Sequence, residues 1–201
     1  MILEKVIAGS GVIAIEGNPH AEISSVCNDS RKVAHGSLFI AVKGFASDGH
    51  TYIATAIGKG ACAIVCEDMD MARSQVAQAG AEGITLVQVG SSRHALAIIA
   101  ANFYDNPSEK LTLVGITGTN GKTTTVTLLH RMFTALGYNC GLLSTIANYV
   151  GNRGTEAVNT TSDPITINSL MSEMVDAGCE YCFMEVSSIG VEQERVAGLK
   201  F

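Results

Sequence analysis

The stretch Leu111-Thr-Leu-Val-Gly-Ile-Thr-Gly-Thr-Asn-Gly-Lys-Thr-Thr-Thr125 decides the fold of the second half of the chain. Its first six residues form a continuous apolar run, which is typical of a central parallel strand. A glycine-rich turn follows, and a helical pattern then extends from about Lys122 to Leu136. This order predicts a phosphate-binding loop, because the loop N–H groups and the positive end of the helix converge on phosphate oxygens.

The residues of this loop have distinct expected roles. We expect Lys122 to reach the terminal phosphates of a nucleotide and the Thr123 hydroxyl to bind Mg²⁺. The common pattern G-x-x-x-x-G-K-[ST] is not met, since Ile116 stands where its first glycine would be, although the core G-T-N-G-K-T is intact. A chance glycine-rich turn is the alternative, and the strand-loop-helix order argues against it. The predicted ATP-binding residues are Gly118, Thr119, Asn120, Gly121, Lys122, Thr123 and Thr124.

An acidic residue follows a second apolar run. Glu185 lies near the end of the predicted buried strand 181–186, and ligands of parallel α/β sheets bind beyond the carboxyl ends of the strands. A carboxylate there can hold Mg²⁺ against the nucleotide phosphates. The alternative is a solvated glutamate at a strand end. With the phosphate loop present, we predict Lys122 and Glu185 as catalytic residues, and Thr123 and Glu185 as the metal ligands.

Apolar runs and helical patterns alternate along the rest of the chain. The order of strand, helix and strand implies α/β sheets with right-handed crossovers. The segment Asn106-Pro107-Ser108 interrupts the pattern, so we predict one domain over residues 1–107 and a second over 108–201 that continues beyond Phe201. The expected strands are 37–42, 62–66, 84–89, 111–116, 140–143 and 181–186, and the expected helices are 51–57, 92–104, 122–136 and 164–177.

The composition excludes several classes of protein. Hydrophobic residues make up 47% and charged residues 16% of the 201 positions, which supports a buried core. The net charge of -6 disfavours general attraction to nucleic acid or anionic lipid. The opening segment, with Glu4 and Lys5, is a poor signal peptide and too short to span a bilayer. We therefore expect a cytoplasmic protein. Cys179 and Cys182 match C-x-x-C, which we interpret as packing, with a metal or redox role as the alternative.

Further motifs, together with the phosphate loop, resemble the Mur ligase family from about residue 22 to Phe201. These motifs are Asn28-Asp-Ser-Arg31, Gly36-Ser-Leu-Phe-Ile-Ala41, Asp48-Gly-His50, Asn159-Thr-Thr161, and Met184-Glu-Val-Ser-Ser188 followed by Gln193 and Arg195. The sequences NTTSDP at 159–164 and EVSS at 185–188 are similar to the MurE type rather than the MurF type. One departure is Ile189, where many MurE sequences have histidine.

The resemblance implies a fold and an activity. It implies a small amino-terminal uridine-nucleotide-binding α/β domain followed by the start of a P-loop-containing parallel-sheet ATPase domain. The implied reaction is the ATP- and Mg²⁺-dependent addition of a third amino acid to UDP-N-acetylmuramoyl-dipeptide, through an acyl phosphate, in peptidoglycan synthesis. The amino acid that the resemblance implies is meso-diaminopimelate or L-lysine. A carboxylated lysine, a histidine near a second Mg²⁺ and a carboxy-terminal domain would lie beyond Phe201, and we expect a monomer.

The resemblance also implies substrate contacts. Without it, Asn28-Asp29-Ser30 would be interpreted as a turn and Arg195 as a solvated helix residue. His50 is interpreted as a turn or helix-start residue, and Lys43 receives no role. The implied uridine-nucleotide contacts are Asn28, Ser30, Phe45, Ala46 and Ser47, and the implied muramoyl-dipeptide contacts are Asn159, Thr160, Thr161, Ser187, Gln193 and Arg195.

Three other functions remain as alternatives. A small-molecule kinase would explain the phosphate loop at 111–136, although it leaves the amino-terminal motifs unexplained. A non-catalytic module that binds a UDP-sugar would explain the amino-terminal motifs, although the Lys122, Thr123 and Glu185 set argues against it. A MurF-type ligase shares most motifs and differs after the acidic residue.

Overall fold

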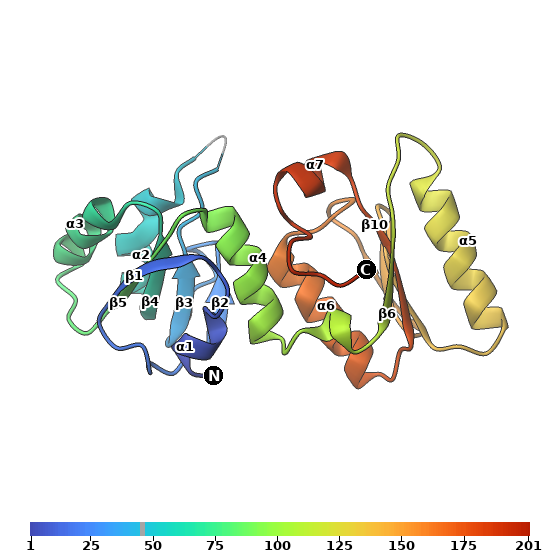
Figure 1. Ribbon diagram of the computed structural model, residues 1–201, viewed down its shortest axis with the longest axis horizontal. Coiled ribbons are helices and arrows are strands. Elements are labelled where there is room, and N and C mark those ends of the chain that lie inside the picture. Colours follow the sequence, from blue (N-terminus) through green and yellow to red (C-terminus); the bar gives the residue numbers. More distant parts are fainter. Residues whose placement is uncertain (45–46) are drawn as a thin grey trace. The chain divides into compact units, whose positions relative to one another are not determined.

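The chain forms two compact units, Met1–Phe103 and Tyr104–Phe201, each built around its own sheet (Figure 1). The computed structural model describes residues 1–44 and 47–201. Two expected contact residues, Phe45 and Ala46, lie outside this described part. Among the described residues, no helix combines the length and the apolar character needed to cross a membrane.

The first unit is an α/β domain with a five-stranded sheet in the order β1-β5-β4-β3-β2. Strands β2, β3, β4 and β5 run parallel, whereas β1 pairs antiparallel with β5. The elements in chain order are α1 (Leu3–Val6), β1 (Val12–Glu16), β2 (Ser25–Cys27), β3 (Ser37–Ile40), the 3₁₀ helix η1 (Gly49–Tyr52), α2 (Ile53–Gly58), β4 (Ala61–Cys66), α3 (Met69–Ala79), β5 (Thr85–Val89) and α4 (Ser92–Phe103).

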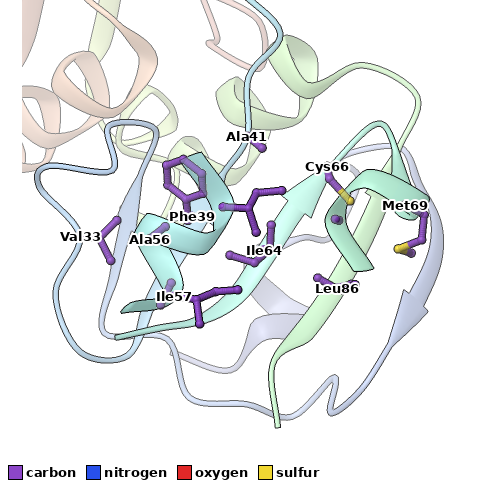
Figure 2. Packing of buried hydrophobic residues seen from close by; sticks show 12 residues of the cluster. Val33, Phe39, Ala41, Ala56, Ile57, Ile64, Cys66, Met69 and Leu86 are labelled. Carbon is purple, nitrogen blue, oxygen red and sulfur yellow. The ribbon is translucent and has the colours of Figure 1, made fainter. Parts of the chain in front are cut away.

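One core cluster of the first unit lies between its parallel strands and the helices α2 and α3, and α1 and α4 bury further apolar residues. Phe39 of β3 pairs in register with Ile64 of β4, and both side chains are at most 1% exposed. Figure 2 shows them beside Ala56 and Ile57 of α2, with Met69 of α3 at the edge of the same cluster. The apolar runs of β3 and β4 form strands because both faces of the strands are covered.

Four elements of the first unit, α1, β1, β2 and α3, were not predicted from the sequence. Strand β1 is an edge strand whose five residues are all exposed, so it carries no burial pattern. Helix α3 has clear end signals, since Asp68 accepts a hydrogen bond from Met71 N and Gly80 follows the helix with φ +61°. The predicted helix 51–57 begins instead as the 3₁₀ helix η1 before it continues as α2.

The second unit contains a five-stranded sheet in the order β6-β10-β7-β8-β9. The predicted parallel sheet is confirmed for β6, β10 and β7, but β8 and β9 add an antiparallel hairpin, so the sheet is mixed. The elements are η2 (Pro107–Glu109), β6 (Thr112–Ile116), α5 (Lys122–Ala135), β7 (Cys140–Leu143), β8 (Ala147–Val150), β9 (Arg153–Glu156), α6 (Pro164–Asp176), β10 (Tyr181–Glu185) and α7 (Ser188–Glu192). The predicted α/β fold class is confirmed.

Strand β10 is buried on both faces of this sheet. Phe183 packs with Val126 of α5, while Cys182 and Met184 pack with Met171 of α6. This alternation follows from the two-residue period of a strand. Figure 1 accordingly shows α5 and α6 on opposite faces of the sheet.

The predicted helix 164–177 is observed as α6, and its ends follow from its local sequence. The Asp163 carboxylate accepts hydrogen bonds from Ile165 N and Thr166 N, and Pro164 occupies the first turn. Gly178, with φ +72°, follows the helix and allows the left-handed turn that ends it.

The cysteines support the packing interpretation. All six are free thiols, and Cys182 lies fully buried in the cluster that packs against α6. Burial raises the pKa of the Cys182 thiol, and it raises the pKa of Cys66 to about 11. Within residues 1–44 and 47–201, no group of three or more His, Cys, Asp or Glu side chains forms a metal cluster.

We expect Phe39→Ala to destabilise the first unit by about 3–5 kcal/mol, because it removes a buried ring and leaves a cavity. Urea unfolding monitored by circular dichroism would measure the loss. The matched control is Tyr52→Ala, since Tyr52 is 45% exposed and should change the stability by under about 0.5 kcal/mol. A loss below about 1 kcal/mol for Phe39→Ala would contradict this account of the core.

Candidate functional site

The phosphate loop connects β6 to α5 in the second unit. The five residues between Ile116 and Lys122 are all exposed. Gly121 precedes the helix with φ +80° and Gly118 has φ +142°, conformations that a side chain would strain. The loop therefore presents its backbone, and the first N–H groups of the 14-residue helix α5, to any ligand above it.

Lys122 folds back over this loop. Its Nζ donates a hydrogen bond to the Gly118 carbonyl oxygen at 2.7 Å. The ammonium group thus already lies at the loop, where the phosphates of a nucleotide would meet it. The role of Lys122 at the phosphates stays a prediction.

The Glu185 carboxylate lies beside the same loop and is 1% exposed. Thr123 Oγ1 donates to Glu185 Oε2 at 3.0 Å. Thr145 N donates to Oε1 at 2.8 Å, and Thr145 Oγ1 donates to Oε2 at 3.2 Å. These donors are neutral, so they orient the carboxylate without cancelling its negative charge.

The register of the sheet explains why these groups meet. Strand β10 pairs parallel with β6, and Glu185 lies opposite Ile116, the last residue before the phosphate loop. The other neighbour of β10 is β7, which leads into Thr145. Because the three strands are parallel, their carboxyl ends share one edge of the sheet. The structure therefore brings together the predicted catalytic and metal residues Lys122, Thr123 and Glu185.

The donor set at this edge suits Mg²⁺. This ion prefers oxygen ligands and commonly binds through one or two protein groups together with phosphate oxygens. Thr123 provides a hydroxyl and Glu185 a buried carboxylate, and their oxygens lie 3.0 Å apart. A buried carboxylate is costly without a cationic partner, which favours a bound cation. The residues present fit the metal.

Thr161 connects β10 to the segment before α6. It is 2% exposed, its Oγ1 donates to the Glu185 carbonyl oxygen at 3.0 Å, and it accepts from Ser187 N at 3.0 Å. The hydroxyl is thus used in two backbone contacts. The predicted contact of Thr161 with substrate stays a prediction, and the structure gives this side chain a supporting position beneath Glu185 and Ser187.

Arg195 completes this part of the site. Its Nη1 donates to the Thr161 carbonyl oxygen at 2.5 Å, while Nε and Nη2 donate to Gln193 Oε1 at 2.9 and 2.6 Å. Ser187 caps α7, since its Oγ accepts from Gly190 N at 3.0 Å. The expected dipeptide contacts Thr161, Ser187, Gln193 and Arg195 therefore form one cluster beyond the carboxyl end of β10.

The two remaining contacts of this group lie in the preceding segment. Thr160 is half-buried and its hydroxyl lies 3.1 Å from the Thr145 hydroxyl, while Asn159 is exposed. Thr145 was not predicted from the sequence. The only signal for it is its place just beyond the predicted strand 140–143, at the sheet edge where ligands bind.

The expected uridine contacts lie in the first unit. Asn28 is exposed and Ser30 is half-buried, directly after β2, while Ser47 is exposed in the segment after β3. These segments follow the carboxyl ends of neighbouring parallel strands. Between Asn28 and Ser30, hydrogen bonds from Arg31 lower the pKa of Asp29 to about 2 and stabilise the turn that the sequence suggested. The contacts of Asn28, Ser30 and Ser47 with a uridine nucleotide stay predictions.

His50 anchors the segment after β3. It is 1% exposed, its Nδ1 lies 2.5 Å from Asp48 Oδ1, and its Nε2 accepts from Glu67 N at 2.9 Å. It is the second residue of η1, which agrees with its interpretation as a turn or helix-start residue. Lys43, which had no assigned role, donates its backbone N–H to Ser92 Oγ at 3.2 Å.

Comparison with known families covers most of the chain. The family described as "Mur ligase family, catalytic domain" matches residues 22–104, and the one described as "Mur ligase middle domain" matches residues 116–201. The chain belongs to the Mur ligase family. The predicted resemblance is confirmed.

Among curated relatives, proteins named UDP-N-acetylmuramoyl-L-alanyl-D-glutamate--2,6-diaminopimelate ligase match the whole chain. The relatives from Cytophaga hutchinsonii and Phocaeicola vulgatus are 50% and 47% identical over 201 residues. The relative from Clostridium perfringens is 43% identical over 202 residues. The chain spans 40% of the length of each of these relatives.

Solved structures support the fold. A structure titled as that of UDP-N-acetylmuramoyl-L-alanyl-D-glutamate--2,6-diaminopimelate ligase matches 98% of this chain and 38% of its own, with a TM-score of 0.74 and 21% identity. A MurF structure from Acinetobacter baumannii matches 83% of this chain and 31% of its own, with a TM-score of 0.54 and 22% identity. At these identities the likeness concerns the fold alone.

We expect Thr161→Val to destabilise the second unit by about 1–3 kcal/mol, because it leaves the Ser187 N–H and the Glu185 carbonyl without their buried partner. Thermal or urea unfolding would measure the loss. Thr161→Ser, which keeps the hydroxyl, is the matched control and should lose clearly less. Equal stability of the Thr161→Val and Thr161→Ser variants would show that the buried hydroxyl does not support this cluster.

Proposed function

We propose that this chain carries the nucleotide-binding part of a MurE-type ligase that adds 2,6-diaminopimelate to UDP-N-acetylmuramoyl-L-alanyl-D-glutamate. The observation that carries the proposal is the Thr123 hydroxyl 3.0 Å from the buried Glu185 carboxylate, at the mouth of a phosphate loop. The names of the relatives support the choice of acceptor. The residues that would select the acceptor are expected outside this chain, so the choice depends on those names alone.

The reaction forms an amide bond at the expense of ATP. A substrate carboxylate attacks the γ-phosphoryl group and releases ADP, and the amine of the incoming amino acid then displaces phosphate from the acyl phosphate. Phosphoryl transfer depends on positioning and charge neutralisation rather than on a protein nucleophile. The site needs no Ser-His-Asp or Cys-His arrangement for this chemistry.

The residues of the second unit would divide this work. The loop from Gly118 to Gly121 and the start of α5 would bind the phosphate chain through backbone N–H groups. Lys122 would neutralise charge on the terminal phosphates. Thr123 and Glu185 would hold Mg²⁺, which supplies further charge neutralisation on the phosphate oxygens when bound.

The dipeptide end of the substrate would bind next to this site. The Arg195 guanidinium offers a planar set of donors that suits a carboxylate, although two of its present acceptors belong to Gln193 and Thr161. Asn159 and Thr160 offer neutral donors from an adjacent segment. A bound carboxylate would therefore compete with these internal acceptors for Arg195.

The uridine nucleotide would bind the first unit at the carboxyl ends of its parallel strands, near Asn28, Ser30 and Ser47. Phe45 and Ala46 belong to the same proposed contact set. A cytoplasmic location and a monomeric state stay predictions. We expect that these 201 residues alone do not complete the ligation. Tripeptide product formed by the isolated chain would contradict that expectation.

A small-molecule kinase would use the same phosphate loop. The match of residues 22–104 to the Mur ligase family argues against it, because a kinase would not need these residues. A MurF-type ligase is less favoured, since the relatives compared above carry the diaminopimelate ligase name and match the whole chain.

We expect Lys122→Ala to weaken the binding of Mg²⁺·ATP by about 10–100-fold, because it removes a charge-assisted contact to phosphate. Isothermal titration calorimetry on the 201-residue chain would measure the affinity. Lys110→Ala is the matched control, since Lys110 is exposed and pairs with Asp105 away from the loop. Equal nucleotide affinities of the Lys122→Ala and unchanged proteins would refute the proposed nucleotide site.

A further inference from the structure

We propose that Thr145 is a positioning residue of the nucleotide site. It holds the Glu185 carboxylate in the orientation that receives Mg²⁺, and it connects that carboxylate to the segment containing Thr160. The inference rests on the proposed function, because it assigns a further residue to the same site.

Thr145 contacts both oxygens of the carboxylate. Its backbone N–H donates to Glu185 Oε1 at 2.8 Å, and its hydroxyl donates to Oε2 at 3.2 Å. Two donors from one residue fix the plane of the carboxylate as well as its position. Thr123 Oγ1 also donates to Oε2, so the hydroxyls of Thr123 and Thr145 share this acceptor oxygen.

Side-chain hydrogen bonds within the turn between β7 and β8 fix the position of Thr145. Ser144 is 3% exposed, and its Oγ donates to the Ala147 carbonyl oxygen at 2.7 Å. Asn148 is 7% exposed, and its Oδ1 accepts from Ser144 N at 3.3 Å. These buried side-chain contacts close the connection between β7 and β8 around Thr145. Thr145 itself is exposed, so its place beside Glu185 is set by the turn rather than by packing of its own side chain.

The hydroxyl of Thr145 has one proton and two acceptors within reach. These are Glu185 Oε2 at 3.2 Å and Thr160 Oγ1 at 3.1 Å. A bond to a carboxylate is stronger than one to a neutral hydroxyl, which favours donation to Glu185. Thr145 thus lies within hydrogen-bond distance of both Glu185 and Thr160. The proposed dipeptide segment is thereby coupled to the proposed metal ligand.

A positioning role and a purely structural role predict different results. A structural turn residue would change stability alone. A residue that orients Glu185 would change the Mg²⁺ concentration needed for nucleotide binding. It would leave the metal-free affinity for nucleotide unchanged, because the phosphate loop and Lys122 are intact.

The test compares Thr145→Val, which removes the hydroxyl, with Thr145→Ser, which keeps it. The binding of ADP to the 201-residue chain is followed by calorimetry while MgCl₂ is varied. We expect Thr145→Val to raise the half-saturating Mg²⁺ concentration by about tenfold, since it loses a hydrogen bond to a charged group. Thr145→Ser should stay within about twofold of the unchanged protein.

Thr155→Val is the matched control, because Thr155 is an exposed threonine on β9 of the same sheet. It should not change the Mg²⁺ dependence. If Thr145→Val does not fold, Thr145→Ala removes the same hydroxyl with a smaller side chain and should raise the half-saturating Mg²⁺ concentration by a similar factor, about tenfold. An unchanged Mg²⁺ dependence in a folded Thr145→Val or, in its place, Thr145→Ala variant would overturn the inference.

The inference and the proposed function fail in different ways. Normal Mg²⁺·ADP binding by the unchanged chain, with no effect of Thr145→Val, removes only the role of Thr145. Absence of nucleotide binding by the unchanged chain removes the proposed function, and the role of Thr145 with it.

Discussion

The structure of the proposed site depends on one buried carboxylate. Glu185 ends β10, is 1% exposed, and meets the Thr123 hydroxyl at 3.0 Å. A negative charge at this depth is costly unless donors and a cation compensate it. The parallel pairing of β10 with β6 and β7 brings those donors to the same edge of the sheet. The fold thus places the Glu185 carboxylate where a metal–nucleotide complex would neutralise its charge.

The same strand end also organises the proposed substrate contacts. The carbonyl oxygen of Glu185 accepts from Thr161, and the Thr161 carbonyl oxygen accepts from Arg195. One residue therefore faces the phosphate loop with its side chain and the dipeptide segment with its backbone. A reaction that joins a nucleotide phosphate to a substrate carboxylate requires the two to be held close together. The hydrogen bonds of the Glu185 side chain and backbone would hold the two binding segments close to each other.

The sequence predicts those structural elements that depend on residues close together in the chain. The continuous apolar run before Gly118, the glycines of the loop and the capping residue Asp163 each act within a few positions, and the structure confirms these elements. The sequence does not predict β1 or β9, because exposed strands leave no periodic burial. The contact of Thr145 with Glu185 was also missed, since it arises from the pairing of distant strands. Family resemblance names the expected contact residues. It does not show which of their hydroxyls already form hydrogen bonds within the protein, as the Thr161 hydroxyl does.

The most direct measurement is a crystal structure of the chain with Mn²⁺ and a non-hydrolysable ATP analogue, with anomalous scattering used to locate the metal. We expect one metal peak in contact with Thr123 Oγ1. The Glu185 carboxylate should bind this metal directly or through a water molecule. The phosphates should lie along the loop from Gly118 to Lys122. A triphosphate bound elsewhere, or a metal remote from both Thr123 and Glu185, would contradict it.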